Sequence, residues 1–310
     1  MRTAALTLAL FSLAACSSPQ GDDPDLGDLA LINANVYTVD AATPTAEALV
    51  VRDDSIVFVG STEDARALIG DRTDVRDLAG KLVLPGFIDT HVHPIAGGGY
   101  ATALSLDTWG TIDDWVAAIA EYAAANPDKD VLFGYGFLAS TFGPVGPTRQ
   151  QIDAVVPDRP VLIMDEGFHG AWANSAALKA LNITQDTRDP VPGYSYYKRD
   201  ESGDATGYLL EGTAEKAMDA LDVINEDVIY EGTGIILDMM NAYGVTAAFD
   251  AGVIGNTDNV GRILERLEDN GHLTVRLVGS SRPESQEDFA DAVATAEQWR
   301  TEIKGRNYHY

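Results

Sequence analysis

The sequence predicts an α/β fold in which parallel strands are joined by helical crossovers. Two observations predict it. Residues 29–84 contain short runs rich in Val and Ile, which are typical of strands. From residue 85 onward, strand-like runs alternate with amphipathic helical stretches. Repeated strand-then-helix units form either a closed barrel or an open doubly wound sheet, and the pattern leaves both possible. The 310 residues suffice for one large domain or two ordinary ones.

The first residues have the pattern of a bacterial secretion signal. Residues 1–16, MRTAALTLALFSLAAC, combine a positive start, an apolar core too short to span a bilayer as a helix, and small residues before the cysteine. The ending LAAC resembles a lipobox, so we interpret residues 1–15 as a signal peptide and Cys16 as the lipidation site. The alternative is an ordinary signal peptide with an incidental cysteine. Residues 16–28 are acidic and predict a flexible tether.

These features predict a secreted lipoprotein that is held to the membrane only through its N-terminal lipid. In a Gram-negative host, Ser17 after the cysteine favours the outer membrane, on its periplasmic side.

The chain has 21 Lys and Arg against 48 Asp and Glu, a net charge of −27. Such a surface repels nucleic acid, so we expect no nucleic-acid partner. Composition leaves the oligomeric state open.

The elements follow in order along the chain. Residues 29–84 form several short strands, with a turn at Asp53 and Asp54. A helix is expected from Thr111, whose hydroxyl caps it, up to Pro127. Further helices are expected after Asn174, before Gly244 and before Gly271, and residues 201–204 form a hairpin turn. About five strands fall after residue 80, whereas a (β/α)₈ barrel needs eight.

The stretch GFIDTHVHP, residues 86–94, carries the clearest chemistry. Side chains alternate along a strand, so His91 and His93 point to the same face. Two imidazoles at the C-terminal end of a strand can bind one Zn²⁺-type ion, and Asp89 could orient one of them. The alternative is a chance H-x-H pair on a strand. The apolar run before it predicts a buried strand, and Gly97–Gly98–Gly99 after it are expected to let the backbone pass close to the metal.

This stretch resembles the first barrel strand of the amidohydrolase superfamily. Residues 147–178, 189–215 and 241–252 resemble, more narrowly, the amidohydrolase-3 group, which includes N-substituted formamide deformylases. The resemblance covers residues 29–310. It implies a small β-sandwich that includes residues 29–84 and a (β/α)₈ TIM-type barrel of which residues 85–310 are the N-terminal part. It also implies a divalent metal, with zinc expected, bound by His91 and His93. The implied reaction is hydrolysis of a non-peptide, amide-like C–N bond in a small-molecule substrate by a metal-activated hydroxide.

The sequence departs from that family in its later motifs. None of the five histidines supplies the later histidine motifs, and the metal-bridging lysine normally lies on a strand that would begin about where Tyr310 stands. Lys304 is a poor substitute. We therefore interpret the chain as the N-terminal portion of a longer enzyme, inactive by itself, with its catalytic groups expected beyond Tyr310.

Two further residues are candidates for the substrate pocket. His169 follows a predicted buried strand, and the family resemblance suggests that it contacts the substrate; a structural histidine is the alternative. Asp250 ends a predicted strand, where barrels place functional side chains, although a structural hydrogen bond would also explain it. Two other functions remain open: a non-catalytic barrel lipoprotein that acts as a binding module, and an ester or cyclic-imide hydrolase on the same scaffold.

Overall fold

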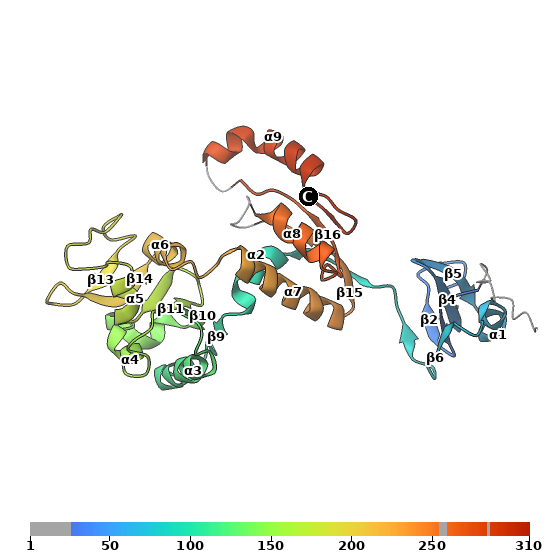
Figure 1. Ribbon diagram of the computed structural model, residues 1–310, viewed down its shortest axis with the longest axis horizontal. Coiled ribbons are helices and arrows are strands. Elements are labelled where there is room, and N and C mark those ends of the chain that lie inside the picture. Colours follow the sequence, from blue (N-terminus) through green and yellow to red (C-terminus); the bar gives the residue numbers. More distant parts are fainter. Residues whose placement is uncertain (1–25, 254–258, 284–285) are drawn as a thin grey trace, which may run out of the picture. The chain divides into compact units, whose positions relative to one another are not determined.

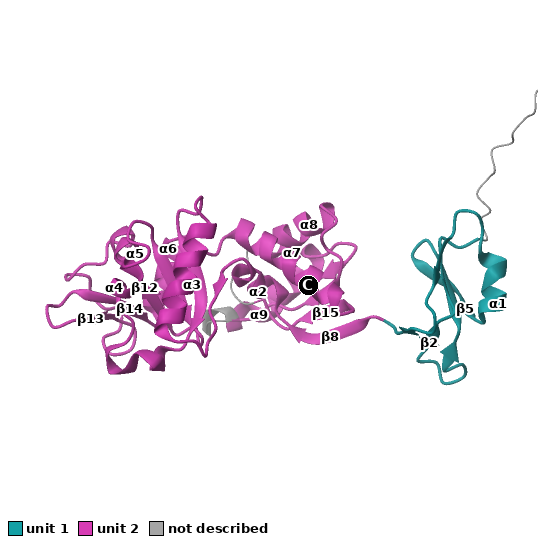
Figure 2. Cartoon of the chain, turned by 90° about the horizontal axis from the view of Figure 1, so that it is seen from below, with its two compact units in different colours: residues 1–85 teal, residues 86–310 magenta. Residues whose placement is uncertain are grey.

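The computed structural model describes residues 26–253, 259–283 and 286–310 (Figure 1). The chain divides into two compact units, Met1–Pro85 and Gly86–Tyr310, which Figure 2 shows in separate colours. The predicted signal peptide, most of the predicted acidic tether and the predicted lipidation site Cys16 lie outside the described residues. Among the described residues, no helix combines the length and the apolar character needed to cross a membrane.

The first unit consists mainly of two small sheets. Its four-stranded sheet has the order β5-β4-β1-β6, and its three-stranded sheet has the order β3-β2-β7. The elements are β1 (Leu29–Ile32), β2 (Asn35–Tyr37), β3 (Thr45–Ala46), β4 (Ala48–Arg52), β5 (Ser55–Gly60), α1 (Thr62–Ala65), η1 (Arg66–Leu68), β6 (Asp74–Asp77) and β7 (Leu82–Val83). Val36 of β2 and Leu49 of β4 share one buried cluster, so the two sheets pack against each other.

The predicted turn at Asp53 joins β4 to β5 in an antiparallel hairpin. Asp53 has a φ of 52°, and Asp is one of the few residues other than Gly that tolerate this left-handed conformation.

The second unit contains the remaining elements. They are β8 (Phe87–Val92), α2 (Pro94–Ala101), β9 (Leu104–Ser105), α3 (Ile112–Ala125), β10 (Leu132–Phe137), η2 (Ala139–Val145), α4 (Arg149–Asp153), β11 (Val161–Asp165), β12 (Gly170–Ala173), α5 (Ser175–Ala180), β13 (Tyr197–Arg199), β14 (Ala205–Leu210), α6 (Gly212–Ala220), α7 (Glu226–Ala242), β15 (Val245–Asp250), α8 (Val260–Asp269), β16 (Arg276–Gly279), α9 (Gln286–Glu302) and β17 (Tyr308–His309).

These strands form two sheets, not the one series of strand–helix units that the sequence pattern predicts. A six-stranded mixed sheet has the order β13-β14-β12-β11-β10-β9, and a four-stranded parallel sheet has the order β17-β16-β15-β8. The partner of β8 is therefore β15, and the whole six-stranded sheet lies between them in sequence (Figure 1). Hydrophobic periodicity identifies strands but not their partners, which explains the difference. Closure of the parallel strands into a barrel stays a prediction.

Strand β8 is exposed, although its apolar sequence predicts burial. Phe87 and Ile88 are 55% and 69% exposed. Within the described residues β8 lies at the edge of its sheet, with β15 as its one neighbour. The described part of the chain therefore covers little of the apolar surface of this strand.

The predicted helix caps are confirmed. Thr111 and Asp114 form a capping box at the start of α3. The Asn174 side chain accepts a hydrogen bond from the Ala177 amide and caps α5. The turn at residues 201–204 joins the antiparallel strands β13 and β14, as predicted.

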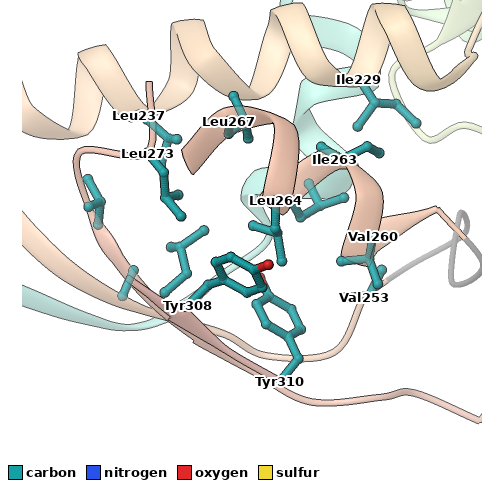
Figure 3. Packing of buried hydrophobic residues seen from close by; sticks show 14 of the residues in the cluster. Ile229, Leu237, Val253, Val260, Ile263, Leu264, Leu267, Leu273, Tyr308 and Tyr310 are labelled. Carbon is teal, nitrogen blue, oxygen red and sulfur yellow. The ribbon is translucent and has the colours of Figure 1, made fainter. Parts of the chain in front are cut away.

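Helices α7 and α8 cover the parallel sheet with an apolar core (Figure 3). Buried residues from both helices contact Leu277 of β16 and the two tyrosines near the end of the chain. The labelled members are Ile229, Leu237, Val253, Val260, Ile263, Leu264, Leu267, Leu273, Tyr308 and Tyr310. This core fixes the C-terminal ends of β15, β16 and β17, where Asp250 and Tyr310 lie.

Candidate metal centre

His91 and His93 lie side by side at the C-terminal end of β8. Their ring centroids are 5.4 Å apart, and the rings meet edge to face. His91 belongs to the strand and His93 follows it directly, so strand alternation puts both on one face, as the spacing predicts. His91 is exposed and the His93 side chain is about one-third exposed. Both imidazoles can therefore be reached by an ion from solvent.

The orientation of His93 is set by the loop after β15. Its Nδ1 lies 3.2 Å from the carbonyl oxygen of Gly252. A carbonyl oxygen only accepts hydrogen bonds, so Nδ1 must carry the hydrogen. In the neutral ring Nε2 then holds the free lone pair. Histidines that bind metals usually donate their other N–H to a carbonyl or carboxylate in this way.

Asp250 lies in the interior behind His93. Its side chain is buried, and Oδ1 is 3.7 Å from His93 Nδ1. The other oxygen, Oδ2, accepts a hydrogen bond of 2.9 Å from the hydroxyl of Tyr310. Burial raises the pKa of the Asp250 carboxyl above its ordinary value, while the hydrogen bond from Tyr310 and the proximity of His93 partly lower it. The candidate pocket residue Asp250 is thus placed next to a predicted metal ligand.

Asp89 does not contact either imidazole ring through a hydrogen bond in the described chain. Its Oδ1 instead accepts the backbone N–H of His91 at 3.0 Å. This bond fixes the backbone at the end of β8, which has a neighbouring strand on only one side within the described residues. The predicted orienting role is taken by the Gly252 carbonyl.

The imidazoles of His91 and His93 can supply part of the coordination sphere of a divalent ion. Two imidazoles on one face, one of them with a fixed tautomer, are the nitrogen ligands that Zn²⁺-type ions prefer. Asp250 Oδ1 is a buried acceptor oxygen without a hydrogen-bond partner, and it lies behind His93. Among the described residues, no group of three or more His, Cys, Asp or Glu is arranged to hold a metal.

His169 forms a second polar centre with Glu211. Its Nδ1 lies 3.1 Å from Glu211 Oε2, and the Glu211 amide donates to the His169 carbonyl at 2.7 Å. The hydrogen bond to Glu211 raises the pKa of His169 above its ordinary value, with the charge of Glu211 as the second cause. The His169 side chain is 75% exposed, so its Nε2 is open to solvent.

The residues around this pair are held by Asp165, at the end of β11. The buried Asp165 accepts the backbone N–H of His169 at 2.9 Å, and burial raises the pKa of its carboxyl. Phe168 has a φ of 59° and is partly exposed. Its ring contacts Tyr100 and Tyr135 at centroid distances of 5.0 and 5.9 Å. Tyr100 belongs to α2, the helix that begins directly after His93.

The candidate residues thus gather in two groups of the second unit. His91, His93 and Asp250 form one, and His169 with Glu211 forms the other; no hydrogen bond or ion pair in the described chain joins them. Gly252 and Tyr310, which contact His93 and Asp250, carry no signal in the sequence alone. Their roles depend on strand register, which periodicity does not reveal.

The model of the amidohydrolase family matches residues 74–309 of the chain. The exoenzymes regulatory protein AepA of Pectobacterium carotovorum is 33% identical over 283 residues, covering 90% of this chain and 59% of that protein. The N-substituted formamide deformylase of Arthrobacter pascens is 36% identical over 190 residues, covering 60% of this chain and 35% of the relative. The chain therefore spans between about a third and three fifths of these curated relatives.

A solved structure shares the fold. A crystal structure of an uncharacterized metal-dependent hydrolase from Pyrococcus horikoshii OT3 superposes with a TM-score of 0.66 and 24% identity, over 91% of this chain and 53% of the other. The family match includes all of β8 and therefore both histidines of the motif. By that match, the chain belongs to the amidohydrolase family.

Proposed function

We propose that this chain is part of a metal-dependent hydrolase that cleaves an amide-like, non-peptide C–N bond. The observation that carries the proposal is the geometry at His93. Its Nδ1–H is held by the Gly252 carbonyl, which leaves Nε2 free beside the ring of His91. Membership in the amidohydrolase family supports the same reading.

In this proposal His91 and His93 hold a divalent ion, with zinc as the expected metal. When bound, such an ion lowers the pKa of a coordinated water to about 7 and polarises a carbonyl oxygen. The two histidines contribute neutral nitrogen ligands, and the buried carboxyl group of Asp250 lies behind His93. The remaining ligands and the group that moves the proton are expected in sequence beyond Tyr310.

His169 would bind the substrate in this scheme. Glu211 favours the protonated ring, in which Nδ1–H faces Glu211 and Nε2–H points away from it. The exposed Nε2–H can donate to a carbonyl oxygen of the substrate and stabilise negative charge there. Phe168 and the tyrosines beside it would supply an apolar wall.

Further parts of the proposal concern the whole protein. We propose that the parallel strands continue into a (β/α)₈ barrel beside a small β-sandwich, and that Cys16 carries a lipid that anchors the secreted protein. The substrate is proposed as an amide because the Arthrobacter relative is named an N-substituted formamide deformylase. An ester or cyclic-imide hydrolase uses the same groups, and a substrate screen separates the three.

Metal content after replacing both histidines tests the proposal. The full-length protein should bind at most about two equivalents of Zn²⁺, measured by mass spectrometry of the metal and by titration calorimetry. His91→Ala with His93→Ala should abolish this binding and any amide hydrolysis. His272→Ala, an exposed histidine whose Nδ1 lies 3.3 Å from the Tyr230 hydroxyl, is the control and should change neither.

Two outcomes would contradict it. Unchanged metal content in the double variant would exclude His91 and His93 as ligands. Metal binding without turnover of any amide, ester or imide would instead favour a binding module.

A further inference from the structure

We propose that Asp250 and Tyr310 are positioning residues for His93. The hydroxyl of Tyr310 donates to Asp250 Oδ2 at 2.9 Å, and Asp250 Oδ1 faces His93 Nδ1 at 3.7 Å. These contacts hold the imidazole with its Nδ1–H toward Asp250, which leaves the lone pair on Nε2. The part of this inference that concerns a metal rests on the proposed function.

The register of the parallel sheet builds this arrangement. Asp250 of β15 pairs with Val92 on one side and with Gly279 of β16 on the other. His93 directly follows Val92, so it emerges next to Asp250 at the C-terminal ends of the strands. Tyr310 directly follows β17, the next strand, and its ring must pass over β16 to reach Asp250.

Gly279 leaves the space that the ring of Tyr310 needs. A Cβ at position 279 would overlap the ring of Tyr310. Tyr310 is 5% exposed and lies in the core beneath α8 (Figure 3). A tyrosine buried to this extent usually hydrogen-bonds its hydroxyl, and here the partner is a buried carboxylate. Gly279, Tyr310 and Asp250 therefore depend on one another for their packing.

The geometry assigns Asp250 to the orientation of the ring and not to the ion itself. Oδ1 lies on the Nδ1 side of His93, whereas a metal would bind at Nε2 on the other side of the ring. Both groups near Nδ1, the Gly252 carbonyl and Asp250 Oδ1, are acceptors, so each favours the same tautomer. Asp250 Oδ1 is buried without a hydrogen-bond partner, which costs free energy. The nearby Nδ1–H of His93 offsets part of this cost.

Two measurements on the full-length protein test the inference. Long-range ¹⁵N–¹H spectra of the metal-free protein report the tautomer of His93, and calorimetric titration with Zn²⁺ reports affinity. Asp250→Asn replaces an acceptor by a group that can also donate, at almost constant shape. We expect a mixture of His93 tautomers in place of Nδ1–H alone, and Zn²⁺ affinity lower by about 10- to 100-fold.

Tyr310→Phe removes a single oxygen and should change both readouts in the same direction by a smaller factor. It keeps the test decisive if Asp250→Asn does not fold. Tyr308→Phe is the matched control: Tyr308 is buried on β17, two residues away, without a hydrogen bond to Asp250 in the described chain, and should leave both readouts unchanged.

The outcomes separate this inference from the proposed function. If Asp250→Asn and Tyr310→Phe leave both the tautomer and the affinity as in the unmodified protein, the positioning role is overturned. If the unmodified protein binds no Zn²⁺, the proposed function fails, and the tautomer spectra still decide whether Asp250 and Tyr310 orient His93.

Discussion

Gly98 of α2 and Gly232 of α7 lie in backbone contact. A Cβ at position 232 would overlap the carbonyl oxygen of Gly98, and one at position 98 would overlap the Thr233 hydroxyl. The Thr233 hydroxyl also lies 3.4 Å from the Pro94 carbonyl. The glycines after the histidine motif therefore let a helix pack closely on α7. Because α2 begins directly after His93, this packing also fixes the direction in which the chain leaves the candidate metal centre.

Gly232→Ala should destabilise the second unit by about 1–3 kcal/mol, because the added methyl group forces α2 and α7 apart. Gly234→Ala is the matched control on the same helix. A Cβ there meets no atom within 4 Å, so this change should stabilise α7 by about 0.5–1 kcal/mol. Urea unfolding followed by circular dichroism measures both, and equal effects of the two variants would exclude the close packing.

Asn174→Ala should cost about 3 kcal/mol, because it removes a helix cap and leaves buried groups unpaired. Asn174 is fully buried. Its Oδ1 accepts the amides of Ala177 and Val161 at 2.8 and 3.0 Å. Its Nδ2 donates to the carbonyls of Val156 and Arg159 at 2.8 and 2.7 Å.

Asn225→Ala is the control for that variant. Asn225 caps α7 through the Val228 amide at 3.1 Å but is only partly buried, so its loss should cost about 1 kcal/mol. Thermal unfolding of both variants gives the comparison. A loss at Asn174 no larger than that at Asn225 would show that the additional buried hydrogen bonds contribute little.

The sequence predicts local features well and spatial partners poorly. The helix caps at Thr111 and Asn174, the turn at Asp53 and the shared face of His91 and His93 depend only on neighbouring residues, and the structure has them. The pairing of β8 with β15, which brings Asp250 to His93, depends on a contact between segments far apart in sequence. The exposure of β8 could not be predicted either. An apolar sequence shows that a strand is suited to burial, but it does not show which element packs over it.

Glu211→Gln should lower the pKa of His169, since the hydrogen bond and the charge of Glu211 both raise it. The raised pKa means that the folded state favours the protonated ring. The resulting stabilisation is fully present below the ordinary value of 6.5 and is lost as the pH rises through the raised pKa. NMR titration of the His169 ring measures the shift. Glu215→Gln, on an exposed residue of α6, is the control and should leave the titration unchanged.

Glu211→Gly should be more stable than Glu211→Gln, and both remove the coupling to His169. Glu211 has a φ of 53° and a ψ of −132°, a conformation that favours glycine, and a non-glycine residue there carries about 1–3 kcal/mol of strain. Such strain persists where the side chain is needed, here for its hydrogen bond to His169. We therefore expect Glu211→Gly to have a higher unfolding midpoint in urea than Glu211→Gln, with the His169 pKa lowered in both. A midpoint in Glu211→Gly no higher than that in Glu211→Gln would show that the backbone at position 211 carries little strain.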